Sequence, residues 1–279
     1  MGTWRSKMRR AHMRRFFALL MFAAIICPLV PANAGATDLQ VCGGLAVRLP
    51  LIEIARLYER DTGVKVSVTI GPPRQLIGRM AEAEVGDVFV PGSCWAMDLA
   101  KSRGVVGKTE GKTIAYLVPC IAVQKGNPLG IRSLLDLARP GLRLVVRSDA
   151  EGPEKPCLGD IAAHAFEAAG IAETAKQNTV ARVDKCDQVP AALRERRADA
   201  VICWTFFTTR FPDELEAIPL SDKAATPRPI PAAVTACAAD PRAARSFVQF
   251  LCSPAAQQVF VRQGYAGIAP RAEPVRPKH

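Results

Sequence analysis

The chain has 279 residues, of which 49% are hydrophobic and 23% are charged, and its formal net charge is +11. This length is sufficient for two lobes, each with its own hydrophobic core. The basic residues are scattered and not interleaved with aromatic residues, which argues against a nucleic-acid partner, and the P-loop and zinc-protease motifs are missing.

Residues 1–36 have the layout of a secretory signal peptide. MGTWRSKMRRAHMRRFF carries six Lys or Arg residues and no acidic residue, ALLMFAAIICPLV is apolar, and PANAGA offers small residues for cleavage. Cleavage lowers the net charge to about +5 and predicts a periplasmic mature chain. A retained N-terminal anchor is the alternative, although the apolar run is short for a membrane span.

The mature chain begins with alternating strand and helix patterns. Strands are predicted at residues 39–42, 64–70 and 87–90, and amphipathic helices at 49–63, 74–84 and 95–104. Strands that alternate with helices in this way pair in parallel through right-handed crossovers. We therefore expect an α/β fold for the first part of the chain.

A second run of alternating elements follows a long extended stretch at residues 114–128. Strands are predicted at 142–147, 179–184, 200–204 and 231–238, and helices at 133–141, 157–170, 187–199, 241–252 and 253–264. Ligands of open α/β sheets bind beyond the carboxyl ends of the strands. Several of these turns carry cysteines, which therefore become candidate site residues.

The order of the motifs resembles the periplasmic molybdate-binding proteins, which are type II solute-binding proteins of ABC importers. The segments that carry this resemblance are LIEIARLYERDTGVKV, GDVFVPGSCWAMD, IAVQKGNPLGIRSLLDLARPGLRLV, RRADAVICW and SFVQFLCSPAAQQVFVRQGY. The resemblance implies a two-lobe type II periplasmic binding protein fold with a hinged cleft that holds a small anion. It places lobe 1 at residues 37–119 and 231–279, and lobe 2 at residues 120–230.

The positions that bind ligand in this family are only partly matched. The serine that usually follows the first strand is replaced by Ala46, and the usual tyrosine is replaced by Trp204. The loop that usually carries a second serine contains Pro72, Pro73 and Arg74 instead. Backbone donors at helix starts would remain, because such donors attract anions whatever the side chains. The expected ligand-binding set is Cys42, Gly43, Ala46, Arg74, Ser93, Cys94, Cys157, Leu158, Cys186 and Trp204.

The eight cysteines of the mature chain have two main interpretations. An exported chain with an even number of cysteines predicts disulfides, with Cys42–Cys94 and Cys157–Cys186 as the expected pairs and Cys120 and Cys237 as expected neighbours. Alternatively, Cys42, Cys94, Cys157 and Cys186 bind a thiophilic ion such as copper(I), zinc or trivalent arsenic. Free, buried cysteines are the third possibility.

The predicted function is that of a monomeric solute-binding protein that captures a small inorganic ion, either a molybdate-type oxyanion or a thiophilic metal, for an ABC permease. We expect no enzymatic activity and no cofactor, because His164 lies seven residues after Cys157, about 10 Å along a helix and too far for a catalytic dyad. The alternative is a redox or metal sensor on the same fold that signals to a membrane partner.

Overall fold

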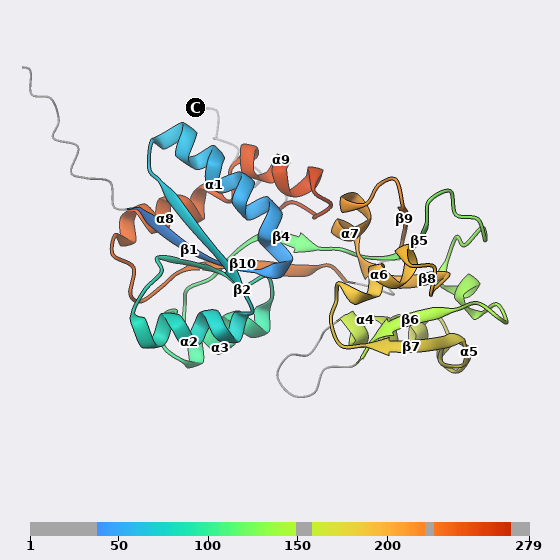
Figure 1. Ribbon diagram of the computed structural model, residues 1–279. Coiled ribbons are helices and arrows are strands. Elements are labelled where there is room, and N and C mark those ends of the chain that lie inside the picture. Colours follow the sequence, from blue (N-terminus) through green and yellow to red (C-terminus); the bar gives the residue numbers. More distant parts are fainter. Residues whose placement is uncertain (1–37, 149–157, 221–225, 269–279) are drawn as a thin grey trace, which may run out of the picture. The chain divides into compact units, whose positions relative to one another are not determined.

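The computed structural model describes residues 38–148, 158–220 and 226–268. These residues form two five-stranded sheets with helices packed on both faces of each (Figure 1). Among the helices in these ranges, none is both long and apolar enough to cross a membrane. The predicted α/β class is therefore confirmed.

The first sheet contains the first three strands and two later ones. Its order is β2 (Val66–Gly71), β1 (Leu39–Gly44), β3 (Val88–Val90), β10 (Arg228–Val234) and β4 (Lys112–Leu117). β1 pairs in parallel with β2 and β3, as predicted, whereas β10 pairs antiparallel with β3 and β4.

Helices from distant parts of the sequence cover this sheet. One face packs against α1 (Arg48–Thr62), α8 (Pro241–Phe250) and α9 (Pro254–Arg262), and the other against α2 (Pro73–Ala83) and α3 (Cys94–Ser102) (Figure 1). In α1, the buried residues Leu51, Ile54, Ala55 and Tyr58 recur at helical spacing, and Gly63 ends the helix with φ of 75°.

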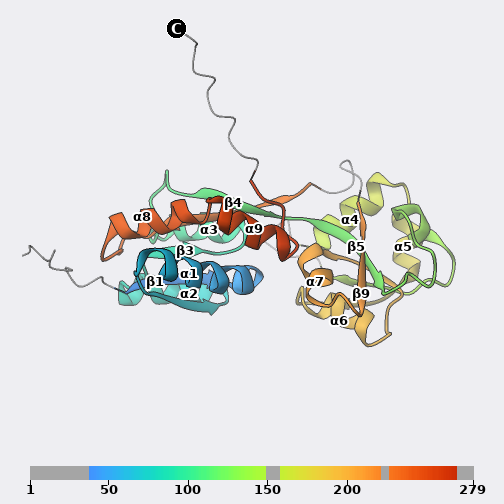
Figure 2. The same ribbon diagram turned by 90° about the horizontal axis from the view of Figure 1, so that it is seen from above.

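The second sheet is formed by the middle of the chain. Its order is β7 (Thr179–Val183), β6 (Leu144–Arg147), β8 (Ala200–Trp204), β5 (Pro119–Gln124) and β9 (Leu215–Pro219). α4 (Leu158–Ala168) and α5 (Ala172–Asn178) lie on one side, and α6 (Gln188–Arg194) and α7 (Thr205–Arg210) on the other (Figure 2). The remaining helical segments are the 3₁₀ turns η1 (Leu45–Val47) and η2 (Leu134–Ala138).

The chain passes from the first sheet to the second through one residue, Val118, between β4 and β5. It returns between β9 and β10. β10 begins at Arg228, three residues before the predicted start, so Arg228–Ile230 pair with β4 of the first sheet. Proline disrupts regular ladders, and a shift in register at Ile230/Pro231 accommodates it here.

Four short elements were not predicted: η1, α5, α7 and β9. α7 has the sequence TFFTTR, whose threonines and phenylalanines are weak helix formers. It forms because tertiary packing buries Phe206 and Phe207.

Candidate functional site

Two turns at the carboxyl ends of neighbouring strands lie against each other. A side chain at Gly44 is excluded, because its Cβ would lie 2.0 Å from the carbonyl oxygen of Pro91. Gly92 has φ of 80°, and a Cβ there would lie 3.2 Å from that of Ala46. Glycine at both positions therefore allows η1, which follows β1, to approach the loop that leads into α3.

A cavity of about 660 Å³ lies at the start of α3. It is lined by residues of α3 and its preceding loop, by the end of β4, by the start of β10 and by the last residue of β8. These residues are Gly92, Ser93, Cys94, Trp95, Asp98, Leu99, Ser102, Leu117, Trp204, Arg228 and Pro229. We call this cavity the α3 pocket.

Arg228 lines the α3 pocket and carries one unsatisfied donor. The Nε atom of Arg228 is buried and has no hydrogen-bond partner among the described residues. A buried donor without a partner costs about 1–3 kcal/mol. The positive charge of Arg228 favours an anionic group in the pocket that this residue lines.

The start of α3 supplies further donors to the same pocket. Ser93 is the N-cap residue of α3, and its side chain makes no capping hydrogen bond. The first backbone N–H groups of a helix point away from its body, and together they attract negative charge. The helix start and Arg228 therefore favour the same kind of ligand.

Cys94 lies at the rim of this pocket as a thiol. Its Sγ donates to the carbonyl oxygen of Pro229 at 3.7 Å. Partial desolvation and then the negative charge of Asp98 raise the pKa of the Cys94 thiol, and the opposing effect of Arg228 is smaller. Thiolate chemistry at Cys94 is therefore disfavoured near neutral pH.

The predicted site residues occupy different surroundings. Ser93, Cys94 and Trp204 line the α3 pocket, and the guanidinium of Arg74 lies 5.4 Å from the ring centre of Trp95, which also lines it. Ala46 lies in η1, where its carbonyl accepts a hydrogen bond from the hydroxyl of Tyr265.

The other predicted site residues are buried or lie outside the described residues. Gly43 and Leu158 are buried, and Cys186 lies near enough to Cys203 to influence its ionisation. Cys157 lies outside the described residues.

The predicted Cys42–Cys94 disulfide is wrong. Cys42 lies opposite Phe89 and packs with α2 and α3 in a small core, with its Sγ 3.2 Å from the position of a Cβ on Gly86. Cys94 lies beyond the other end of β3, so the two side chains have different neighbours.

The expected contact between Cys120 and Cys237 is also wrong. Cys120 lies on β5 opposite Cys203 of β8, whereas Cys237 follows β10 and its Sγ donates to the carbonyl oxygen of Gly86 at 3.4 Å. The prediction failed because Cys237 lies beyond the carboxyl end of β10, beside Gly86, and not next to the start of β5.

No group of three or more His, Cys, Asp or Glu residues suited to a metal ion occurs in residues 38–148, 158–220 and 226–268. Cys42, Cys94 and Cys186, the three described residues of the predicted four-cysteine metal site, therefore do not form such a group. Its fourth member, Cys157, lies outside these ranges.

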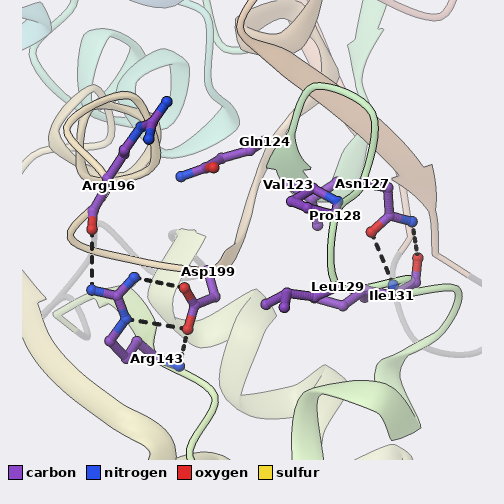
Figure 3. Close-up of a pocket in the computed structure, with 9 residues that line it drawn as sticks. All are labelled: Val123, Gln124, Asn127, Pro128, Leu129, Ile131, Arg143, Arg196 and Asp199. Atoms are coloured by element: carbon purple, nitrogen blue, oxygen red, sulfur yellow. Dashed lines mark hydrogen bonds and ion pairs between the residues drawn. The ribbon is translucent and has the colours of Figure 1, made fainter.

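A second cavity, of about 240 Å³, lies at the edge of the second sheet (Figure 3). Two of its three charged side chains already have partners: Arg143 pairs with Asp199 at 2.7 Å and donates to the carbonyl oxygen of Arg196 at 3.1 Å. The guanidinium of Arg196 points away from this pair (Figure 3). This cavity is therefore a weaker candidate for a ligand site than the α3 pocket.

The two sheets and the pocket at the strand ends are the architecture expected of a two-lobe solute-binding protein. The profile of the family described as bacterial extracellular solute-binding proteins matches residues 39–266, and the chain belongs to this family. This match confirms the predicted resemblance to solute-binding proteins, and the solved structures confirm the predicted two-lobe type II fold.

Three known proteins illustrate the similarity. The molybdate-binding protein ModA of Mycobacterium bovis is 23% identical over 233 residues, which are 83% of this chain and 85% of that relative. A solved structure described as "substrate binding domain of putative molybdenum ABC transporter from Clostridium difficile" has a TM-score of 0.72 at 17% identity and covers 83% of this chain and 99% of that one. PEB3 of Campylobacter jejuni, solved with L-phospholactate, has a TM-score of 0.69 at 24% identity, with 83% and 100% coverage.

Proposed function

We propose that this protein is the exported, monomeric solute-binding component of an ABC importer. It captures a small oxyanion in the α3 pocket and delivers it to a permease in the inner membrane. Family membership supports the solute-binding role, and the fold shared with a substrate-binding domain of a molybdenum transporter supports the partner.

The observation that carries the choice of ligand is the buried, unpartnered Nε of Arg228 in the wall of the pocket. Arginine binds carboxylate, phosphate and similar oxyanions through two parallel hydrogen bonds. The start of α3 would complete the oxyanion's coordination through backbone donors.

The size of the pocket extends the range of oxyanions to be considered. A volume of about 660 Å³ falls within the range of pockets that hold small organic molecules. Trp95, Trp204 and Leu117 add apolar surface, which would contact the carbon skeleton of an organic phosphate or carboxylate. The shared chemistry is the oxyanion group, carried either by an inorganic ion or by a small organic acid.

A thiophilic metal has less support as the ligand. Cys94 is the one cysteine among the lining residues of the α3 pocket, and the pKa of its thiol is raised rather than lowered. The positive charge of Arg228 would also repel a metal cation.

Thermal unfolding with a panel of ligands tests this proposal. A ligand at one hundred times its dissociation constant stabilises the folded state by about 2.7 kcal/mol, which corresponds to a melting shift of roughly 5–11 °C for a chain of this size. The inorganic arm contains molybdate, tungstate, sulfate and phosphate, and the organic arm contains phospholactate and small dicarboxylates. Copper(I), zinc and arsenite under reducing conditions form the metal arm.

The matched variants are Arg228→Gln in the pocket and Arg242→Gln on the exposed start of α8. We expect Arg228→Gln to abolish the shift given by the best oxyanion and Arg242→Gln to retain it. Circular dichroism verifies that both variants are folded. An oxyanion shift that survives in Arg228→Gln, or a shift in the metal arm alone, contradicts the proposed ligand class.

A further inference from the structure

Cys120 and Cys203 lie directly opposite each other on the antiparallel strands β5 and β8. Both residues are 0% exposed. Directly opposed residues on antiparallel strands have Cα atoms about 4.5–5.5 Å apart, and disulfides join residues whose Cα atoms are about 4.4–6.8 Å apart. The backbone therefore already holds these two residues at a distance suited to a bridge.

The two side chains point to the same face of the sheet. The neighbouring Cys120 thiol and burial raise the pKa of the Cys203 thiol well above its ordinary value. The Sγ of Cys203 also approaches the carbonyl oxygen of Trp204, at 3.6 Å.

Membership of an extracellular family places the chain in an oxidising compartment. We propose that Cys120 and Cys203 form a disulfide in the exported protein. This inference is independent of the ligand proposed for the α3 pocket, and it assigns a bridge different from those expected from the sequence.

The bridge forms while the chain folds, because both thiols are inaccessible in the folded state. The oxidant is a protein disulfide of the compartment, of the dithiol carrier class. One cysteine thiolate attacks this disulfide to give a mixed disulfide and a carrier thiolate, and the second cysteine then displaces the other carrier sulfur. Two electrons and two protons pass to the carrier, which becomes a dithiol.

The bridge has a structural consequence near the ligand pocket. It ties β5, which enters the second sheet directly after Val118, to β8, which ends at Trp204 in the wall of the α3 pocket. It also closes a long loop of chain, between residues 120 and 203, and the entropy that a bridge removes from the unfolded state grows with loop length.

Peptide mapping of the full-length exported chain tests the bridge directly. Trypsin places Cys120 in the peptide 113–125 and Cys203 in the peptide 198–210, and each peptide contains a single cysteine. After alkylation without reduction, we expect these two peptides to appear as one cross-linked species that separates on reduction. Recovery of both as alkylated single peptides overturns the proposal, as does a link from either one to another cysteine, such as Cys186 in the peptide 186–194.

Melting temperatures of oxidised and reduced protein give a second measurement. Chain refolded in a buffer of oxidised and reduced glutathione should melt about 8–16 °C above the reduced chain. The double variant Cys120→Ala/Cys203→Ala should lose most of this difference, and the control Cys252→Ala should keep it. A difference as large in the double variant as in the wild type overturns the proposal. The peptide map uses the wild-type chain. It therefore still decides the question if the double variant does not fold.

Discussion

Cys94 and Asp98 lie one helical turn apart on α3 and form a testable pair. Asp98 is the second cause, after desolvation, of the raised pKa of the Cys94 thiol. Asp98→Asn removes this negative charge, lowers the thiol pKa and increases the thiolate fraction near neutral pH. We expect iodoacetamide to alkylate Cys94 about two- to fivefold faster in Asp98→Asn than in the wild type.

The rate is measured by mass spectrometry on the tryptic peptide 80–101, in which Cys94 is the one cysteine. The difference in alkylation rate should vanish at a pH above the Cys94 pKa of both the wild type and Asp98→Asn, where the thiol is ionised in both proteins. The control Asp213→Asn changes an exposed carboxylate on another part of the chain and should leave the rate unchanged. Equal rates for Asp98→Asn and wild type at neutral pH contradict the assigned role of Asp98.

At the level of single residues, the sequence identified the pocket only in part. Ser93, Cys94 and Trp204 were predicted because they follow strand ends, where ligands of α/β sheets bind. Arg228 was missed because it precedes the predicted start of the strand that returns to the first sheet, and what marks it is one buried nitrogen atom without a hydrogen-bond partner. That burial depends on tertiary packing, although an arginine between Pro227 and Pro229 at a lobe boundary was a usable signal.

At the level of elements, Asp87 connects three segments of the first sheet. Its carboxylate accepts hydrogen bonds from the backbone N–H of Gln40 and of Ala239, each at 2.7 Å. Its backbone donates to the carbonyl oxygen of Gln40 and accepts from the N–H of Thr235. The turn before β3 therefore holds both β1 and the segment that follows β10.

Replacing Asp87 with Asn should destabilise the fold. One carboxylate oxygen becomes an NH₂ group, which faces a backbone donor and leaves it unsatisfied at a cost of about 1–3 kcal/mol. We expect a melting temperature roughly 2–12 °C below that of the wild type by calorimetry. Asp213→Asn, at an exposed position, should stay within about 0.5 kcal/mol of the wild type. Equal stability of the two variants would show that the Asp87 contacts are not needed.

Helices and strands were predictable where the hydrophobic periodicity extends over many residues. The helix of residues 48–62 and the parallel pairing of the first three strands followed from hydrophobic spacing and from the alternation of strand and helix. The partners of β10 were not predictable, because a strand that contains Pro229 and Pro231 looks like a linker. The predicted strand also ran to residue 238, whereas β10 ends at Val234, so Cys237 lies beyond the strand and away from Cys120.

At the level of the whole molecule, export is the property most directly tested. The charge and hydropathy pattern of residues 1–36 predicts a mature N-terminus close to Gly35 or Thr37. Intact mass measurement of protein from the periplasmic fraction should give this shortened chain. Recovery of a chain that starts at Met1 from membranes would instead support a retained anchor.

Val118, the single residue between β4 and β5, has a consequence for how the gene can vary. Its carbonyl oxygen accepts hydrogen bonds from the backbone N–H and the hydroxyl of Thr205, at 2.9 Å and 3.1 Å. Side chains alternate between the two faces of a strand, so one inserted residue here would turn the buried side chains of β5, Cys120 and Ala122 among them, to the opposite face. A codon insertion or deletion at this position should therefore be eliminated by selection, so the length of the β4–β5 junction is expected to be invariant among functional descendants of this gene.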